Sequence, residues 1–162
     1  MNHLDLLRGQ PCTDFRILAG GSLILYLGDR PDERSLTAWR LHVDTAWRVD
    51  GPSGPVVGSL DVCCEGRPAE WIFQGLGSLI GRQIEEATVG APVRDLRMQF
   101  SGGYRLLTFA HCVSESEGWE LRHRGGLRIR VRSLTEFVEH REAPDGVADQ
   151  DAVPDGGRSS AV

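Results

Sequence analysis

The chain has 162 residues, of which 40% are hydrophobic and 25% are charged, and its formal net charge is −5. These values are ordinary for a globular protein, and the length suits one domain with a sizeable core. No run approaches the roughly 18 apolar residues of a membrane-spanning helix, and Asp5 and Arg8 stand where a signal peptide needs an apolar segment. We therefore expect one domain over residues 1–141, in the cytoplasm and without a membrane partner.

Short apolar or alternating runs predict a mainly β fold. The expected strands cover residues 22–27, 41–49, 56–63, 96–100, 104–109 and 127–132. Glycine pairs at positions 20, 102 and 125 adjoin several of these runs. Such pairs fit hairpin turns, because glycine reaches positive φ without a steric penalty. The pattern predicts antiparallel meanders packed as one β core.

One or two short helices are expected beside this core. The first is predicted over residues 68–80, where Pro68 suits the first helical position. The second is predicted over residues 134–141, where Ser133 can cap the helix and Glu136 completes a capping box. We expect this second helix to pack on the sheet and close the domain.

The two halves of the chain share landmarks at a nearly constant offset of 72 or 73 residues. The matched pairs are Gly9 and Gly81, Leu23 and Leu96, Leu25 and Met98, Leu27 and Phe100, and Trp47 and Trp119. The shared order is Leu-x-x-Gly, an alternating strand, a polar turn and Trp-x-apolar. An internal duplication would produce this order, and chance similarity is the alternative.

No motif in the chain indicates a catalytic residue. The glycine-rich run QGLGSLIG at residues 74–81 lacks the strand before it and the helix after it that a nucleotide loop needs, so we expect a helix end and a turn. Cys63, Cys64, His111 and Cys112 could be imagined as a zinc site, but their spacing favours reduced thiols. We expect no metal, no cofactor and no catalytic residue.

A stripe of arginines is the clearest candidate for binding. If residues 127–132 form a strand, Arg128, Arg130 and Arg132 share one face, which could meet an acidic partner, RNA or the protein's own tail. A solvated outer face is the simpler alternative. The acidic segment 142–162 carries a net charge of −4 and is expected to be disordered, which leaves −1 for the rest, so a nucleic-acid partner is not expected.

Several short runs carry a resemblance to a family. They are AWRVD at residues 46–50, VVGSLD at 56–61, LIGRQI at 79–84, RDLRMQF at 94–100 and GWEL at 118–121. This order resembles that of small uncharacterised bacterial β-rich proteins, some of which accompany immunity genes of polymorphic toxins. The resemblance implies a small protein-binding fold and supplies no catalytic residues.

The leading hypothesis is a non-enzymatic protein-binding module, and its more specific form is an immunity protein that sequesters a toxin. The alternative is a small-molecule-binding or enzymatic β domain with a site between the two halves that uses Arg48, Asp61 and Asp95. Independently of either function, we expect Trp47 and Trp119 to be buried, and Arg48 to pair with Asp61 across a hairpin.

We predict that a chain ending at Glu142 melts within a few degrees of the full chain. The removed segment holds no apolar cluster able to offset its ordering entropy. Thermal unfolding followed by circular dichroism measures the difference, and a large loss of stability would show that the segment docks on the domain.

Overall fold

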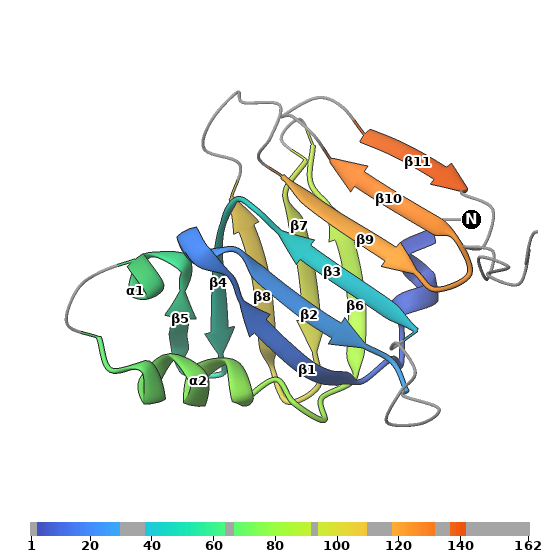
Figure 1. Ribbon diagram of the computed structural model, residues 1–162. Coiled ribbons are helices and arrows are strands. Elements are labelled where there is room, and N and C mark those ends of the chain that lie inside the picture. Colours follow the sequence, from blue (N-terminus) through green and yellow to red (C-terminus); the bar gives the residue numbers. More distant parts are fainter. Residues whose placement is uncertain are drawn as a thin grey trace, which may run out of the picture.

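A computed structural model describes residues 3–29, 38–63, 67–91, 94–109, 118–131 and 137–141, which form two antiparallel sheets packed face to face (Figure 1). The six-stranded sheet has the order β1 (Cys12–Ile17), β2 (Leu23–Leu27), β3 (Trp39–Val43), β9 (Trp119–His123), β10 (Leu127–Val131) and β11 (Phe137–Arg141). The five-stranded sheet has the order β5 (Gly54–Gly58), β4 (Ala46–Gly51), β8 (Tyr104–Phe109), β7 (Leu96–Phe100) and β6 (Ile84–Val89). The mainly β, antiparallel fold is therefore confirmed.

Short helices cover the ends of the sheets. They are the 3₁₀ turns η1 (His3–Leu7) and η2 (Ala19–Gly21) and the α-helices α1 (Ser59–Cys63) and α2 (Ala69–Gly77). The first predicted helix corresponds to α2, with Pro68 at its N-cap, and QGLGSLIG forms the end of this helix and the following turn. Within the described ranges, no helix has the length and apolar character needed to cross a membrane.

Glycine in α2 permits close packing on β5. A Cβ atom added at Gly75 would lie 2.9 Å from the Cβ of Val57, closer than real Cβ atoms approach. The glycine lowers the intrinsic helix propensity of this segment, but it lets the helix backbone lie directly against the sheet edge.

Three sequence expectations require correction. The second predicted helix is wrong, because residues 137–141 form β11 and pair with all of β10. Backbone pairing with an open sheet edge outweighed the local helix signals. The predicted strand 41–49 is two strands, β3 and β4. The chain crosses from the six-stranded to the five-stranded sheet between them, at Asp44. The predicted strand 56–63 ends at Gly58, where α1 follows. The proposed caps Ser133 and Glu136, and the acidic segment 142–162, lie outside the described residues.

The core lies between the sheets and is built from alternating strand positions. Trp47 and Trp119 are 2% and 3% exposed, as predicted. The Trp47 Nε1–H group donates to the carbonyl of Gly21 at 2.8 Å, and the Trp119 Nε1–H group donates to the carbonyl of Arg94 at 2.9 Å. Each indole therefore keeps its polar atom satisfied while its ring fills the core.

The order of the strands reveals a structural repeat. The first half builds a meander, β1 to β3, and then a hairpin, β4 and β5, in the other sheet. The second half builds a meander, β6 to β8, and then returns to the first sheet with β9 and β10. Each meander pairs with the hairpin of the other half, through β3 with β9 and β4 with β8. The two halves therefore repeat the same order of strands, and each half completes its sheet with the hairpin of the other.

Backbone hydrogen bonds between the two halves join equivalent positions in pairs. Gly9 N–H donates to the carbonyl of Ile84 at 2.7 Å, and the equivalent Gly81 N–H donates to the carbonyl of Cys12 at 2.8 Å. Cys12 N–H donates to the carbonyl of Arg82, and the equivalent Ile84 N–H donates to the carbonyl of Gln10, both at 2.9 Å. Pro11 and Gln83, which are equivalent positions, form an antiparallel bridge between these bonds. Gly9 and Gly81 both have a φ of +79°. The sequence repeat and the structural repeat thus coincide.

We predict that Gly9→Ala and Gly81→Ala each lower the free energy of unfolding by about 1–2 kcal/mol, the cost of a Cβ atom in the left-handed region. No atom lies within 4 Å of an added Cβ at either position, so the cost comes from φ alone. Urea denaturation measures it. Gly77→Ala is the control, because Gly77 is helical and open, and it should be neutral or stabilising by up to about 1 kcal/mol. A neutral result at Gly9 or Gly81 would contradict the prediction.

Candidate functional site

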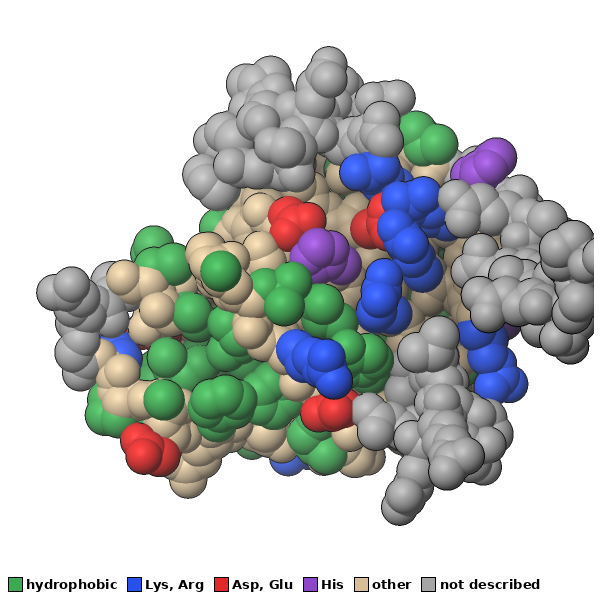
Figure 2. Space-filling view, in the orientation of Figure 1, with side chains coloured by type: hydrophobic (Ala, Val, Ile, Leu, Met, Phe, Trp, Pro, Cys, Tyr) green, Lys and Arg blue, Asp and Glu red, His purple; other side chains and the backbone are tan. Residues whose placement is uncertain are grey.

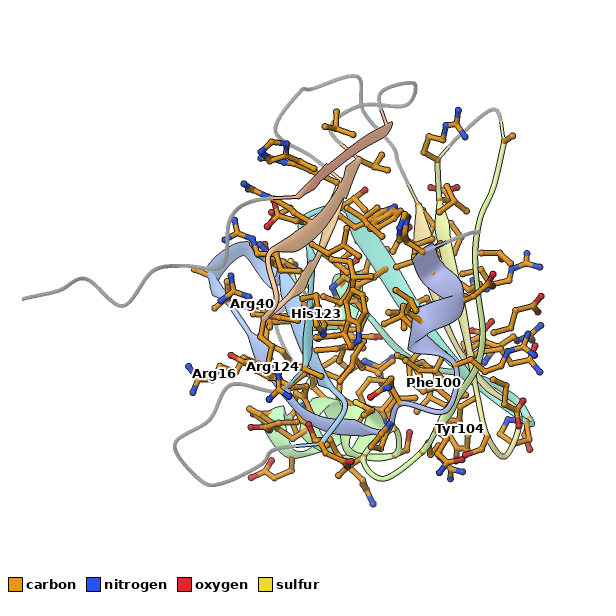
Figure 3. The ribbon with its side chains drawn as sticks, turned by 90° about the vertical axis from the view of Figure 1, so that its right-hand side faces the viewer. Arg16, Arg40, Phe100, Tyr104, His123 and Arg124 are labelled. Atoms are coloured by element: carbon orange, nitrogen blue, oxygen red, sulfur yellow. The ribbon has the colours of Figure 1, made fainter. Side chains whose placement is uncertain are left out.

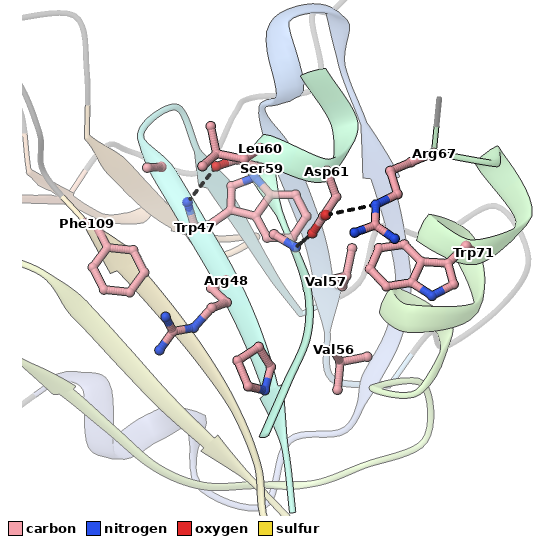
Figure 4. Close-up of a pocket in the computed structure, with 13 residues that line it drawn as sticks. Trp47, Arg48, Val56, Val57, Ser59, Leu60, Asp61, Arg67, Trp71 and Phe109 are labelled. Atoms are coloured by element: carbon pink, nitrogen blue, oxygen red, sulfur yellow. Dashed lines mark hydrogen bonds and ion pairs between the residues drawn. The ribbon is translucent and has the colours of Figure 1, made fainter. Parts of the chain in front are cut away.

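A pocket opens beside α1 and α2, against β4 and β5 of the five-stranded sheet (Figure 4). Its volume is about 490 Å³. Its walls include the apolar side chains of Val56, Leu60, Trp71 and Phe109 and the charged side chains of Arg48, Asp61 and Arg67. All of these except Phe109 come from the first half of the chain. The pocket therefore belongs mainly to one repeat and does not lie between the two.

Arg48 is fixed at one side of this pocket by Asp50. Its Nε and Nη2 atoms lie 2.7 and 3.2 Å from the two carboxylate oxygens, and the Asp50 side chain is only 7% exposed. The guanidinium also lies 5.4 Å from the centroid of the Phe109 ring. This bidentate pair satisfies a buried carboxylate while one face of the guanidinium covers an aromatic ring.

The predicted pair of Arg48 with Asp61 is wrong. Asp61 lies in the first turn of α1, where its Oδ2 accepts the backbone N–H of Gly58 at 2.8 Å. This is the reciprocal contact of a capping box, and it holds the carboxylate at the helix start. The nearest guanidinium is that of Arg67, with Nε at 3.6 Å from Oδ1. The chain turns into a helix before Asp61, so the expected cross-strand geometry does not form.

The opposite side of the pocket repeats the same combination of groups. The Arg67 guanidinium lies 4.8 Å from the centroid of the Trp71 ring and pairs with Asp61. Both guanidiniums of the pocket therefore cover an aromatic ring and have a carboxylate partner, and Figure 4 shows them on either side of Val57. The charges are internally balanced, and the space between them is mainly apolar.

Exposed apolar side chains surround the two helices. We call Leu18, Leu60, Trp71 and Phe73 the apolar edge. Leu60 is 76% exposed and Phe73 is 55% exposed, and α1 has no buried residue. Phe73 contacts the ring of Phe15 on β1 at a centroid distance of 5.7 Å. This end of the molecule leaves large hydrophobic groups in water.

Asp95 lies in a different place from Arg48 and Asp61. It lines a second hollow of about 410 Å³, formed by residues before β7, by the end of β6 and by β8. Phe109 lines both hollows. The three residues of the alternative function are therefore not brought into one cleft.

The arginine stripe of β10 belongs to a larger group on the outer face of the six-stranded sheet. We call Arg40, Arg122, Arg128 and Arg130 the arginine cluster. The last three contact Glu120, and Arg40 lies opposite Arg122 on the neighbouring strand. Glu120 pairs with Arg122, with Arg128 Nη2 at 2.7 Å and with Arg130 Nε at 3.5 Å. The alternation predicted for β10 is confirmed, since Leu127, Ile129 and Val131 are buried on the opposite face. Arg132 lies outside the described residues.

The pKa of Glu120 is lowered in this cluster. Burial acts to raise it, but hydrogen bonds and charges from Arg122 and Arg128 outweigh the burial. A lowered pKa means that the ionised carboxylate stabilises the fold at pH values above the pKa of an unfolded glutamate. This stabilisation is lost as the pH falls through the lowered pKa.

The described part of the chain contains two cysteines in different environments. Burial raises the pKa of the Cys12 thiol to about 12, so this cysteine is a poor nucleophile at neutral pH. Cys63 is exposed, and both cysteines are free thiols. Within the described ranges, no group of three or more candidate metal ligands lies together. Cys64, His111 and Cys112 lie outside those ranges, so the expectation that no metal binds stays a prediction.

Some of these residues could have been found from the sequence, and others could not. The outward direction of Glu120 and Arg122 follows from the alternation of β9 around the buried Leu121. Arg40 joins them only because β3 pairs with β9, more than 70 residues later in the chain. The exposure of Leu60 and Trp71 also has no sequence signal, because both resemble ordinary core residues.

Comparisons with known proteins found no matching family model, no matching curated protein and no matching solved structure. The resemblance to small proteins associated with immunity genes therefore stays a prediction.

We predict that Arg48→Ala lowers the free energy of unfolding by about 1–3 kcal/mol, because it leaves the buried Asp50 carboxylate without its partner. Arg67→Ala is the matched control. It breaks an exposed pair and should cost less than about 1 kcal/mol. Urea denaturation at neutral pH measures both changes, and equal losses would contradict the distinction between the two pairs.

Proposed function

We propose that the protein is a non-enzymatic protein-binding module that docks its partner on the apolar edge, with a side chain of the partner entering the adjacent pocket. The observation that carries this proposal is the exposure of Leu60, Trp71 and Phe73 within one short segment beside a hollow of about 490 Å³. Exposed apolar groups that gather in this way mark interaction surfaces more often than those scattered singly.

The energetics of the apolar edge favour a covered state. Removing apolar surface from water contributes roughly 25 cal/mol per Å², and aromatic anchors dominate many protein interfaces. Leu60 and Phe73 gain only part of this free energy within the chain, because more than half of each side chain stays exposed. A partner that covers them would recover it.

The composition of the pocket also suits an apolar anchor. Arg48 and Arg67 are already paired with Asp50 and Asp61, so few unsatisfied polar groups point into the space. A small-molecule ligand is the second candidate, because the volume of the pocket lies within the usual range of about 300–1,000 Å³ for ligand sites. The immunity protein that sequesters a toxin is the most specific form of our proposal, and its support is the sequence resemblance alone.

Affinity capture from native host cells with matched variants tests this function. The immobilised full chain should retain one protein in stoichiometric amount. Leu60→Asp should abolish the capture, because it places a charge in the apolar edge. Leu6→Asp is the control, since Leu6 is an exposed leucine on η1, at 44% exposure, outside the apolar edge.

Both substitutions lie on exposed side chains, so thermal unfolding should show that each variant stays folded. Equal capture by the Leu60→Asp variant would exclude the apolar edge as the interface. The lack of any stoichiometric protein partner would contradict the binding-module proposal and favour a small molecule in the pocket.

A further inference from the structure

The arginine cluster contains an arrangement that is unfavourable for the isolated protein. Arg40, Arg122 and Arg128 are direct cross-strand neighbours on β3, β9 and β10. Side chains in such positions have Cβ atoms about 4.5–5.5 Å apart, and like charges directly opposite one another destabilise a sheet. Three guanidiniums therefore stand in one row across three adjacent strands.

One carboxylate pairs with three of these arginines. Glu120 contacts Arg122, Arg128 and Arg130. Arg40 is exposed and forms no ion pair with any described residue. Each guanidinium presents five N–H donors in a planar fork, so a large donor capacity faces outward.

The cluster lies on the same face of the molecule as part of the apolar surface. Figure 2 shows the arginines as a band over β3, β9 and β10, with hydrophobic side chains gathered over α1, α2 and β1 beside it. Figure 3 shows Arg16, Arg40 and Arg124 on the side of the six-stranded sheet that faces away from the other sheet. One partner could cover both surfaces.

We propose that the arginine cluster is a binding site for an acidic segment of a protein partner, whose carboxylates pair with Arg40 and Arg122. Carboxylates match the planar fork of a guanidinium and form charge-assisted hydrogen bonds with it. They would also relieve the repulsion within the row. The inference rests on the proposed function only in assigning the carboxylates to a protein.

A nucleic acid fits the same surface less well. Residues 1–141 have a net charge of only −1, and the cluster adjoins an apolar surface. Binding to single strands usually combines a long basic groove with exposed aromatic stacking platforms. A compact cluster of four arginines beside hydrophobic side chains is better suited to a short acidic peptide.

Fluorescence anisotropy of the full chain at low salt tests the site without the native partner. The probe is a labelled synthetic peptide of alternating glutamate and serine, and the same peptide with glutamine is its neutral control. Arg40→Gln and Arg122→Gln should each weaken binding of the acidic peptide by about three- to fivefold, the value of an exposed ion pair. Glu120→Gln should strengthen it, because the competing carboxylate is removed.

Arg105→Gln is the matched control, since Arg105 is an exposed arginine on β8 of the other sheet and removes the same charge. Equal weakening by Arg105→Gln, or equal binding of the glutamine peptide, would overturn the site. Tighter binding of a single-stranded oligothymidine with the same dependence on Arg40 would assign the cluster to nucleic acid instead.

Competition distinguishes a partner from the chain itself. A synthetic peptide with the sequence of residues 142–155 is added to the full chain with the bound probe. Displacement at concentrations well below those needed for unlabelled glutamate peptide would assign the cluster to the acidic end of this chain and overturn the proposal. Because these measurements use no native partner, they can succeed or fail independently of capture at the apolar edge.

Discussion

The two repeats are joined by the strand pairs β3 with β9 and β4 with β8, on which both sheets depend, and by the hydrogen-bonded bridge between Pro11 and Gln83. The four backbone bonds around it join the start of β1 to the start of β6, which lie at edges of different sheets. Gly9 and Gly81 provide the left-handed turns that lead into these strands. Each meander can then pair with the hairpin of the other half, so that neither repeat completes a sheet alone.

This exchange explains how one repeated framework presents two different surfaces. Arg48 and Asp50 on β4 occupy the same places in the repeat as Glu120 and Arg122 on β9, with the order of the charges reversed. In the first repeat the acid is buried beneath a single arginine. In the second it lies among several arginines and leaves an excess of positive charge. Core positions are constrained by packing in both repeats, whereas outward positions are free to diverge.

The sequence predicted best those features that depend on side-chain type alone. The burial of Trp47 and the positive φ of Gly102 follow from the residues themselves, and the nearly constant offset between the halves, which left chance similarity open, matches the repeated strand order. Features that depend on distant strands could not be predicted. The helix expected at residues 134–141 had local capping signals, but no pattern in the sequence indicated that β10 would offer an open edge with which residues 137–141 pair. Arg40 reaches the arginine cluster only through the pairing of β3 with β9.

Equivalent positions of the two repeats line the pocket in the first repeat and form the arginine cluster in the second. Gly58 on β5 corresponds to Arg130 on β10, and Val56 corresponds to Arg128. A Cβ atom at Gly58 would lie only 3.0 Å from the carbonyl oxygen of Trp47. Glycine therefore fits this position, and no side chain extends from it into the pocket. In the other repeat, long arginine side chains extend from the same positions and gather around Glu120. The first repeat therefore leaves an apolar hollow on the outer face of one sheet, whereas the second carries a charged surface on the outer face of the other.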